Sequence, residues 1–206
     1  MEEVLDVYCR SYNAKFPQVC MDETNKQLLG DIRHPSKPKP NQVAKFDSEY
    51  KRNGNVNIFL AFEPLAGKRI TQVTNRRTKN DWAYFIKDLV DIHYKDAEKI
   101  VLVMDNLNTH DKASLYDTFK PQEAKRIADK LEIHFTPKHG SWLNMAEIEF
   151  SHLTRQCLNR RIENKEKITY EVKAWTYDRN KQKLKTSWRF NIDNARIKLN
   201  KLYPDI

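Results

Sequence analysis

Apolar residues recur with two different spacings along the chain, and both spacings predict regular structure. Residues 55–63 (NVNIFLAFE) begin with alternating polar and apolar positions, which is typical of a β-strand. Residues 68–74 (KRITQVT) follow after the turn sequence PLAG, so the two segments predict a β-hairpin. The next apolar residues recur at helical spacing: Trp82, Phe85, Ile86, Leu89 and Val90. We expect a helix that Thr78 or Asn80 caps and that ends at about His93.

Two other apolar segments predict neighbouring parallel strands. The first is QVCMDET, residues 18–24, which we expect to be a strand ending in acid at Asp22. The second is IVLVM, residues 100–104, whose unbroken apolar run indicates burial on both faces and which ends at Asp105. A right-handed crossover through the hairpin and helix makes this strand parallel to the first. Asp22 and Asp105 should then lie at the same edge of the sheet, where α/β proteins bind their ligands.

The remaining segments complete an α/β prediction of a mixed sheet flanked by helices. The proline-rich stretch 31–54 predicts a long loop, because proline removes a hydrogen-bond donor and fixes φ. The other expected elements are a helix over 2–11, a helix over 121–131, a strand over 132–137, and helices from Asn144 onward separated near Asn164 and Thr186. We expect residues 1–206 to form a single domain, since 39% hydrophobic content can fill one core.

Charge and cysteine usage narrow the class of protein. The net charge of +9 indicates a polyanionic partner, and residues 151–206 alone carry 14 Lys and Arg against 6 Asp and Glu. An ordinary solvated helical surface is the alternative explanation. Three cysteines without CxxC spacing predict neither a disulfide framework nor a zinc site, so we expect a reduced, cytoplasmic protein. No apolar run is long enough for a membrane span, and the N-terminus does not resemble a signal peptide.

Three acids are candidates for a divalent-metal site: Asp22, Asp105 and Glu147. Mg²⁺ takes oxygen ligands and usually keeps one or two carboxylates beside water and phosphate. Each acid also has an ordinary structural explanation. The aspartates suit turns, and Glu147 suits a capping box with Asn144 as the N-cap. Glu149 competes with Glu147, because the two residues project in different directions from a helix and periodicity does not choose between them.

The strings VLVMDNLNTH and FTPKHGSWLNMAEIEF resemble the catalytic domain of DDE transposases from bacterial insertion sequences, in the superfamily that includes the mariner elements. The third acid of that family lies in a motif of the form S-P-x-L-N-P-I-E. Ser141, Leu143, Asn144 and Glu147 fall on its fixed positions. The sequence departs from the motif in two ways: Met145 replaces a proline, and one residue is missing between the serine and the leucine.

The resemblance implies a ribonuclease H-like fold with Asp22, Asp105 and Glu147 as catalytic and metal-binding residues. It implies DNA cleavage and strand transfer with Mg²⁺ or Mn²⁺, using two ions about 3.5 to 4 Å apart. Candidate auxiliary residues are His110, His139 and Asn106. Candidate DNA-binding residues are Arg76, Arg77, Arg160, Arg161, Lys181, Lys183 and Lys185. The expected partners are transposon ends and target DNA, bound by a homo-oligomer in a prokaryotic, nucleoid-associated setting.

Only 21 residues precede Asp22, whereas such transposases normally carry helix-turn-helix domains there. We therefore expect no N-terminal helix-turn-helix domain in this sequence. A separate chain that supplies it, a fragment and a trimmed sequence are all consistent with this expectation. Two alternative functions stay open: a catalytically idle, DNA-binding or partner-binding remnant that regulates a transposase, and a stand-alone nuclease.

Overall fold

The computed structural model describes residues 1–33, 36–43, 48–107 and 110–202. Within these residues one mixed sheet has the strand order β3-β2-β1-β4-β5. The strands are β1 (Gln18–Asp31), β2 (Tyr50–Glu63), β3 (Lys68–Thr74), β4 (Ile100–Met104) and β5 (Leu131–Phe135). β2 is antiparallel to β1 and β3, whereas β1, β4 and β5 run parallel to one another. The hairpin and the parallel pair predicted from the sequence are both confirmed.

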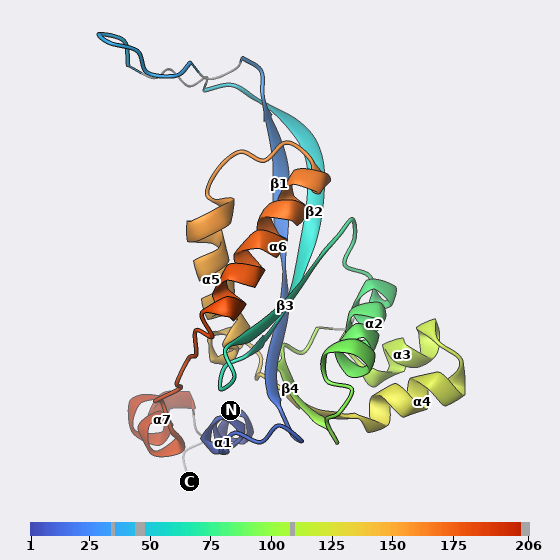
Figure 1. Ribbon diagram of the computed structural model, residues 1–206. Helices are drawn as coiled ribbons and strands as arrows, with labels where there is room; N and C mark the ends of the chain where they lie inside the picture. Colours follow the sequence, from blue (N-terminus) through green and yellow to red (C-terminus); the bar gives the residue numbers. More distant parts are fainter. Residues whose placement is uncertain (34–35, 44–47, 108–109, 203–206) are drawn as a thin grey trace.

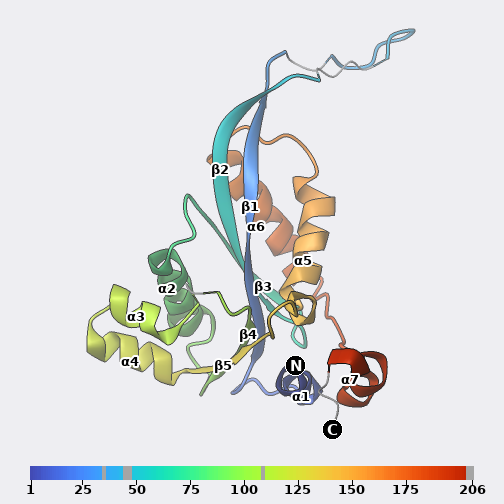
Figure 2. The ribbon, with the colours of Figure 1, turned by 180° about the vertical axis from the view of Figure 1, so that it is seen from behind.

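Helices cover both faces of the sheet. They are α1 (Glu2–Cys9), α2 (Lys79–Asp88), α3 (Lys112–Thr118), α4 (Pro121–Asp129), α5 (Ala146–Leu153), α6 (Lys165–Lys181) and α7 (Ile192–Lys198). α2, α3 and α4 lie on one side, and α5 and α6 on the other (Figures 1 and 2). α1 and α7 lie beside each other near the end where β1 begins (Figure 1). This arrangement confirms the predicted mixed sheet flanked by helices.

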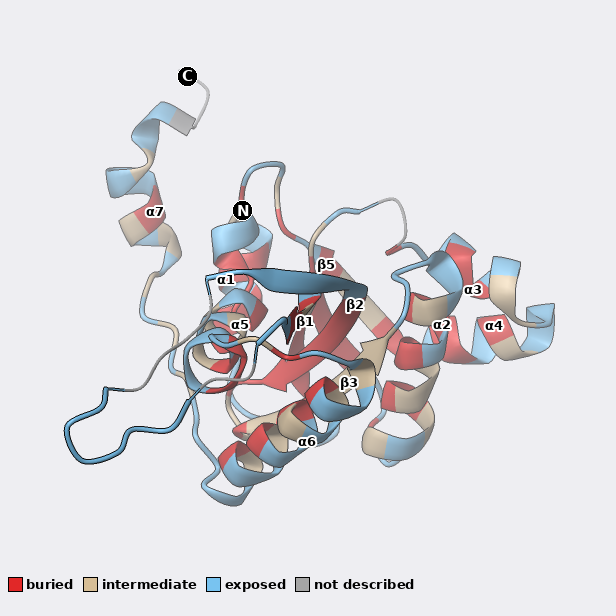
Figure 3. Cartoon of the chain, turned by 90° about the horizontal axis from the view of Figure 1, so that it is seen from above, coloured by how far each residue is buried: buried red, intermediate tan, exposed pale blue. Residues whose placement is uncertain are grey.

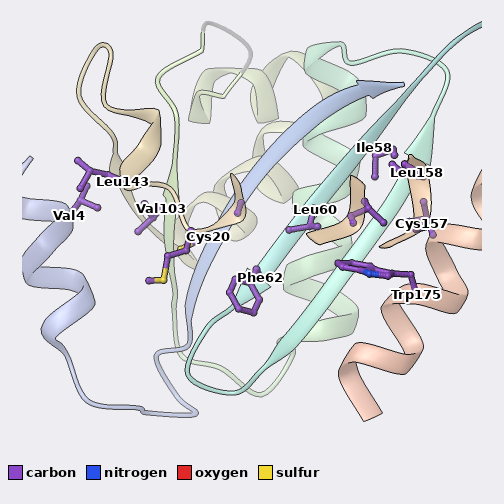
Figure 4. Packing of buried hydrophobic residues seen from close by; sticks show 14 of the residues in the cluster. Val4, Cys20, Ile58, Leu60, Phe62, Val103, Leu143, Cys157, Leu158 and Trp175 are labelled. Carbon is purple, nitrogen blue, oxygen red and sulfur yellow. The ribbon is translucent and has the colours of Figure 1, made fainter. Parts of the chain in front are cut away.

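The alternation of side chains along the strands creates two separate cores. Successive residues of a strand point to opposite faces, so Cys20 packs on the side of α5 and α6 while Val19 and Met21 pack on the side of α2. In β4 the same alternation separates Val103 from Leu102. Figure 4 shows the first cluster, in which Cys20 and Val103 lie close to one another. The unbroken apolar run of β4 is therefore explained by burial on both faces.

The predicted loop over residues 31–54 begins where β1 ends, at Asp31, but it ends too late, and the strand predicted over 18–24 is too short. β1 continues to Asp31 and β2 already begins at Tyr50, so the strands pair far beyond the core and form a projecting arm (Figure 1). The first six residues of β2 are exposed (Figure 3), which is why hydrophobic periodicity missed them. Because β1 continues to Asp31, Asp22 lies within a strand and not at its end. Backbone hydrogen bonds between β1 and β2 extend both strands. The amino-acid composition gives no indication of this pairing.

Local capping determines where several helices begin. Thr78 caps α2 through a capping box with Asp81, which selects it over Asn80. Asn164 caps α6, as the predicted break near that residue implied. α3, capped by Asp111, was not predicted from the sequence because it is short and carries few apolar residues. None of the helices in the described ranges is long and apolar enough to cross a bilayer.

Candidate active site

Asp22 and Asp105 lie side by side at one edge of the parallel strands. The register of β1 and β4 pairs Cys20 with Val103, and each aspartate follows two residues later. β4 ends at Met104, so Asp22 lies just beyond the part of β1 that pairs with β4. Because side chains alternate, Asp22 shares the face of Cys20, which is the face that α5 covers. The predicted convergence of the two aspartates is therefore present in the fold.

The start of α5 is fixed to Asp22 through Asn144. The fully buried Asn144 carboxamide donates from Nδ2 to Met21 O at 2.9 Å and to Asp22 Oδ2 at 3.4 Å. Its Oδ1 accepts from the Ala146 backbone N–H at 3.1 Å. The N-cap position is Met145, without a side-chain cap. Asn144 nevertheless bonds the first turn of α5 in the way that an N-cap side chain does, so the capping interpretation of Asn144 holds in part. Glu147 is exposed on that turn.

The pKa of Asp22 shows that the three acids share one electrostatic environment. Burial has the largest effect on the pKa of Asp22 and raises it. A hydrogen bond from the Glu23 backbone N–H lowers this pKa and partly offsets the effect of burial. The negative charges of Asp105, Glu23 and Glu147 raise it further, to about 7. A carboxylate that lies among other negative charges is a place that attracts a cation. Within the described ranges, however, no three acid, His or Cys side chains converge closely enough to hold a metal ion.

His110 connects Asp105 to Glu23 from the opposite side of the sheet. Its Nδ1 lies 2.6 Å from Asp105 Oδ1, and its Nε2 lies 2.9 Å from Glu23 Oε2. Burial lowers the pKa of His110, but the two carboxylates outweigh this effect and raise it to about 9. The imidazole stacks on the buried Trp82 ring of α2, with 6.0 Å between ring centroids. His110 therefore holds the Asp105 carboxylate in place as a charged donor.

Glu149 lies in a buried ion-pair cluster away from this edge. Its carboxylate accepts from Arg69 Nε at 2.8 Å and Nη2 at 2.9 Å, and from Arg179 Nε at 3.1 Å and Nη2 at 3.0 Å. The Glu149 and Arg69 side chains are both 0% exposed. The cluster joins α5 to β3 and α6. Two guanidinium groups saturate the Glu149 carboxylate, whereas the Glu147 side chain is exposed and its charge acts on Asp22.

A pocket of about 390 Å³ opens next to Asp105. It is lined by Asp105, Asn106, Leu107, Thr136, Pro137, Lys138, His139 and Ser141. The structure therefore brings the two auxiliary candidates His139 and Asn106 to the same hollow as Asp105. His139 has a positive φ of 62°, an uncommon conformation for a residue other than glycine.

The candidate DNA-binding residues fall into three groups. Arg77 lies at the acidic edge, with Nη1 3.8 Å from Glu23 Oε1, and Arg76 is exposed beside it. Arg160 and Arg161 form ion pairs with Glu171 and Asp31 at 2.6 and 2.8 Å, so acidic neighbours already balance their charge. The exposed lysines are at the end of α6 and after it: Lys181, Lys183 and Lys185.

Sequence reasoning missed two positioning residues of this site, Glu23 and the Asn144 carboxamide. Glu23 is the residue after Asp22, and the alternation of a strand places it on the opposite face, where His110 lies. A pair of adjacent acids in an otherwise apolar strand was the available indication. The contact of Asn144 with Asp22 spans 122 residues and had no local pattern to predict it.

The mixed sheet with helices on both faces and two aspartates on adjacent parallel strands defines a ribonuclease H-like domain. The fold matches those of Mos1 mariner transposase structures. A Mos1 paired-end complex with left transposon end gives a TM-score of 0.58 at 16% identity, covering 89% of this chain and 56% of that one. A Mos1 mariner paired-end complex with Mn gives 0.57 at 12%, covering 89% and 55%. The Mos1 strand transfer complex gives 0.51 at 14%, covering 89% and 55%.

The sequence profile of the DDE superfamily endonucleases matches residues 17–169. This match spans most of the chain and includes Asp22, Asp105 and Glu147. The chain therefore belongs to the DDE endonuclease superfamily. It spans little more than half the length of the Mos1 chains that share its fold. A comparison with proteins of curated function finds no match.

Proposed function

We propose that this chain is a transposase catalytic domain that cleaves and joins DNA strands with divalent metal ions at Asp22, Asp105 and Glu147. One observation carries the proposal. Asp22 and Asp105 each follow, by two residues, the paired Cys20 and Val103 of adjacent parallel strands, and the charges of Asp105 and Glu147 add to the burial that raises the pKa of Asp22 to about 7. A domain that needed these residues only as helix caps or turn formers has no reason to gather them at one edge of its sheet. The membership in the DDE endonuclease superfamily supports the same function.

The donor set fits Mg²⁺ or Mn²⁺. These ions prefer carboxylate oxygen, and the candidate site offers three carboxylates and no thiolate. Asp22 and Asp105 would hold the ions from adjacent strands, and Glu147 would complete the set from α5. When bound, two such ions activate the attacking oxygen and stabilise the leaving one. The protein's own part is to hold the carboxylates. Asn144 fixes Asp22, and His110 fixes Asp105.

DNA is the partner that the charge of the chain favours. The Mos1 structures with the same fold are complexes with a transposon end, a paired end or a strand transfer product, which supports transposon and target DNA as partners here. The proposed catalytic domain acts as a homo-oligomer on DNA. The motif from Ser141 to Glu147 supports an origin in a bacterial insertion sequence.

Cleavage should depend on the metal. We expect the purified chain to nick supercoiled plasmid DNA with Mg²⁺ or Mn²⁺, and to lose this activity completely when EDTA is added and regain it when Mn²⁺ is returned. Gel electrophoresis of the plasmid forms measures the reaction. Equal nicking in EDTA would contradict the proposal. DNA binding without any metal-dependent nicking would instead support a catalytically idle remnant.

A further inference from the structure

A second hollow lies at the other end of the sheet from the acidic edge. Its volume is about 510 Å³, within the range of sites that take small ligands. It is lined by Tyr12, Leu65, Ala66, Gly67, Lys68, Asn180, Lys183 and Lys185. The register pairs Cys20 with Phe62, so the turn between β2 and β3 lies where β1 begins, while Asp22 lies further along that strand. The two sites are therefore separate.

The walls of this hollow, which we call the lysine pocket, are fixed by backbone contacts. Gly67 has a φ of 68°, and a Cβ added there would lie 2.6 Å from the carbonyl carbon and oxygen of Lys183. The turn and the segment after α6 are therefore in direct contact. Arg69 reinforces this contact by donating to Gly67 O at 2.8 Å and to Leu184 O at 2.6 Å. Asn180 Nδ2 donates to the Arg69 carbonyl at 2.8 Å.

Three lysines line the lysine pocket: Lys68, Lys183 and Lys185. Lys68 is half-buried, donates to His93 O at 2.8 Å and lies 4.1 Å above the Tyr94 ring. Burial lowers the pKa of Lys68, and the charge of Glu63 opposes this effect. Lys183 and Lys185 are exposed, and within the described part of the chain neither forms an ion pair. Two lysines are therefore available to a ligand, whereas Arg160 and Arg161 have acidic neighbours.

We propose that the lysine pocket binds a backbone phosphate of DNA, as a contact separate from the acidic edge. Lysines neutralise phosphates as point charges and give affinity without reading sequence. The proposal rests on the proposed function only in taking DNA as the partner. DNA is favoured over a free phosphate because Lys183 and Lys185 lie exposed on the surface, where a duplex can reach them, in the most basic part of the chain. A duplex bound there would extend the footprint of the domain beyond the cleavage site.

The test compares two double variants that remove the same charge. Lys183→Gln with Lys185→Gln changes the lysine pocket. Lys120→Gln with Lys173→Gln changes two exposed lysines outside it and is the matched control. The binding of a fluorescent random-sequence duplex is measured by anisotropy over a series of salt concentrations, without divalent metal. Each phosphate contact contributes about 0.9 to the slope of log affinity against log salt, so the pocket variant, which loses one phosphate contact, should lose roughly 0.9 while the control keeps the wild-type slope.

A titration with inorganic phosphate, followed by the amide NMR signals of Ala66 and Gly67, distinguishes the two sources of the ligand. We expect the duplex to shift these signals in the wild type and not in the pocket variant. An unchanged slope in the pocket variant overturns the proposal while leaving the cleavage function intact. Phosphate binding together with an unchanged slope assigns the pocket to a free phosphate and also overturns it. If the wild type binds no duplex at any salt concentration, the proposed function fails as well.

Discussion

Glu149→Gln is expected to lower the free energy of unfolding by about 3 to 5 kcal/mol, the usual cost of removing one partner from a buried ion pair. The glutamine keeps the shape of the side chain but leaves the guanidinium groups of Arg69 and Arg179 without a negative charge. Arg69 is fully buried and Arg179 almost so, so water cannot replace the lost partner. For a chain of this size we expect Tm to fall by at least roughly 6 °C. Urea denaturation and thermal unfolding followed by circular dichroism measure both quantities.

The same cluster should make folding sensitive to acid. Burial tends to raise the pKa of Glu149, but the hydrogen bonds from Arg69 and Arg179 outweigh it and hold the pKa below its ordinary value of 4.5. A depressed pKa in the folded state gives stability that is present above 4.5 and is lost as the pH falls through the lower, folded value. The Glu149→Gln variant has no such group to titrate. Its stability should therefore change less than that of the wild type below about pH 4.5.

Glu147→Gln is the matched control for stability. It makes the same chemical change two residues earlier on α5, at an exposed carboxylate, where substitutions usually change stability by less than about 0.5 kcal/mol. Equal stability of Glu149→Gln and the wild type would contradict the structural role of the cluster. Equal destabilisation by both variants would show that α5 tolerates no change in its first turn.

The parts of the fold with short-range patterns could be predicted from the sequence. The hairpin of β2 and β3, the helix capped by Thr78 and the buried strand β4 all follow from periodicity and capping within a few residues. The arm of β1 and β2 could not be predicted, because its outer residues are polar and exposed. Hydrogen bonds between the two strands hold the arm, and the outer residues pair with partners 19 to 23 residues away in the sequence. Proline-rich composition correctly indicated an irregular segment but overestimated its length.

The candidate site shows the same division. Asp22 and Asp105 could be placed together because both follow apolar strands that a right-handed crossover makes parallel. Periodicity left Glu147 and Glu149 equivalent, since an apolar stripe passes between them. The two glutamates differ because Arg69 and Arg179 bind Glu149 in the protein interior. These arginines lie 80 and 30 residues from Glu149 in the sequence. Asn144, expected to cap a helix, does accept from the Ala146 backbone N–H in the first turn of α5. Its amide nitrogen also donates to Asp22, which no local pattern predicted.

Asp105→Asn and Glu147→Gln are each expected to reduce Mg²⁺-dependent DNA nicking at least about a hundredfold. Stabilisation of developing charge by a metal ion contributes several kcal/mol, and each 1.36 kcal/mol is a factor of ten in rate. Asparagine keeps an oxygen that can accept from His110 but loses the charge that anchors an ion. Neither side chain belongs to the hydrophobic clusters, so both variants should keep the fold. Single-turnover nicking rates, measured per folded molecule, give the effect.

Glu166→Gln supplies the control for activity, because it removes an exposed carboxylate from the first turn of α6, outside the acidic edge. It should nick DNA at the wild-type rate. Retained activity in Asp105→Asn would refute the metal mechanism. Activity retained in Glu147→Gln but lost in Glu149→Gln, under conditions where both variants are folded, would transfer the third acid to Glu149. The ion pairs of Glu149 argue against that outcome, since a ligand carboxylate would first have to leave two buried guanidinium groups.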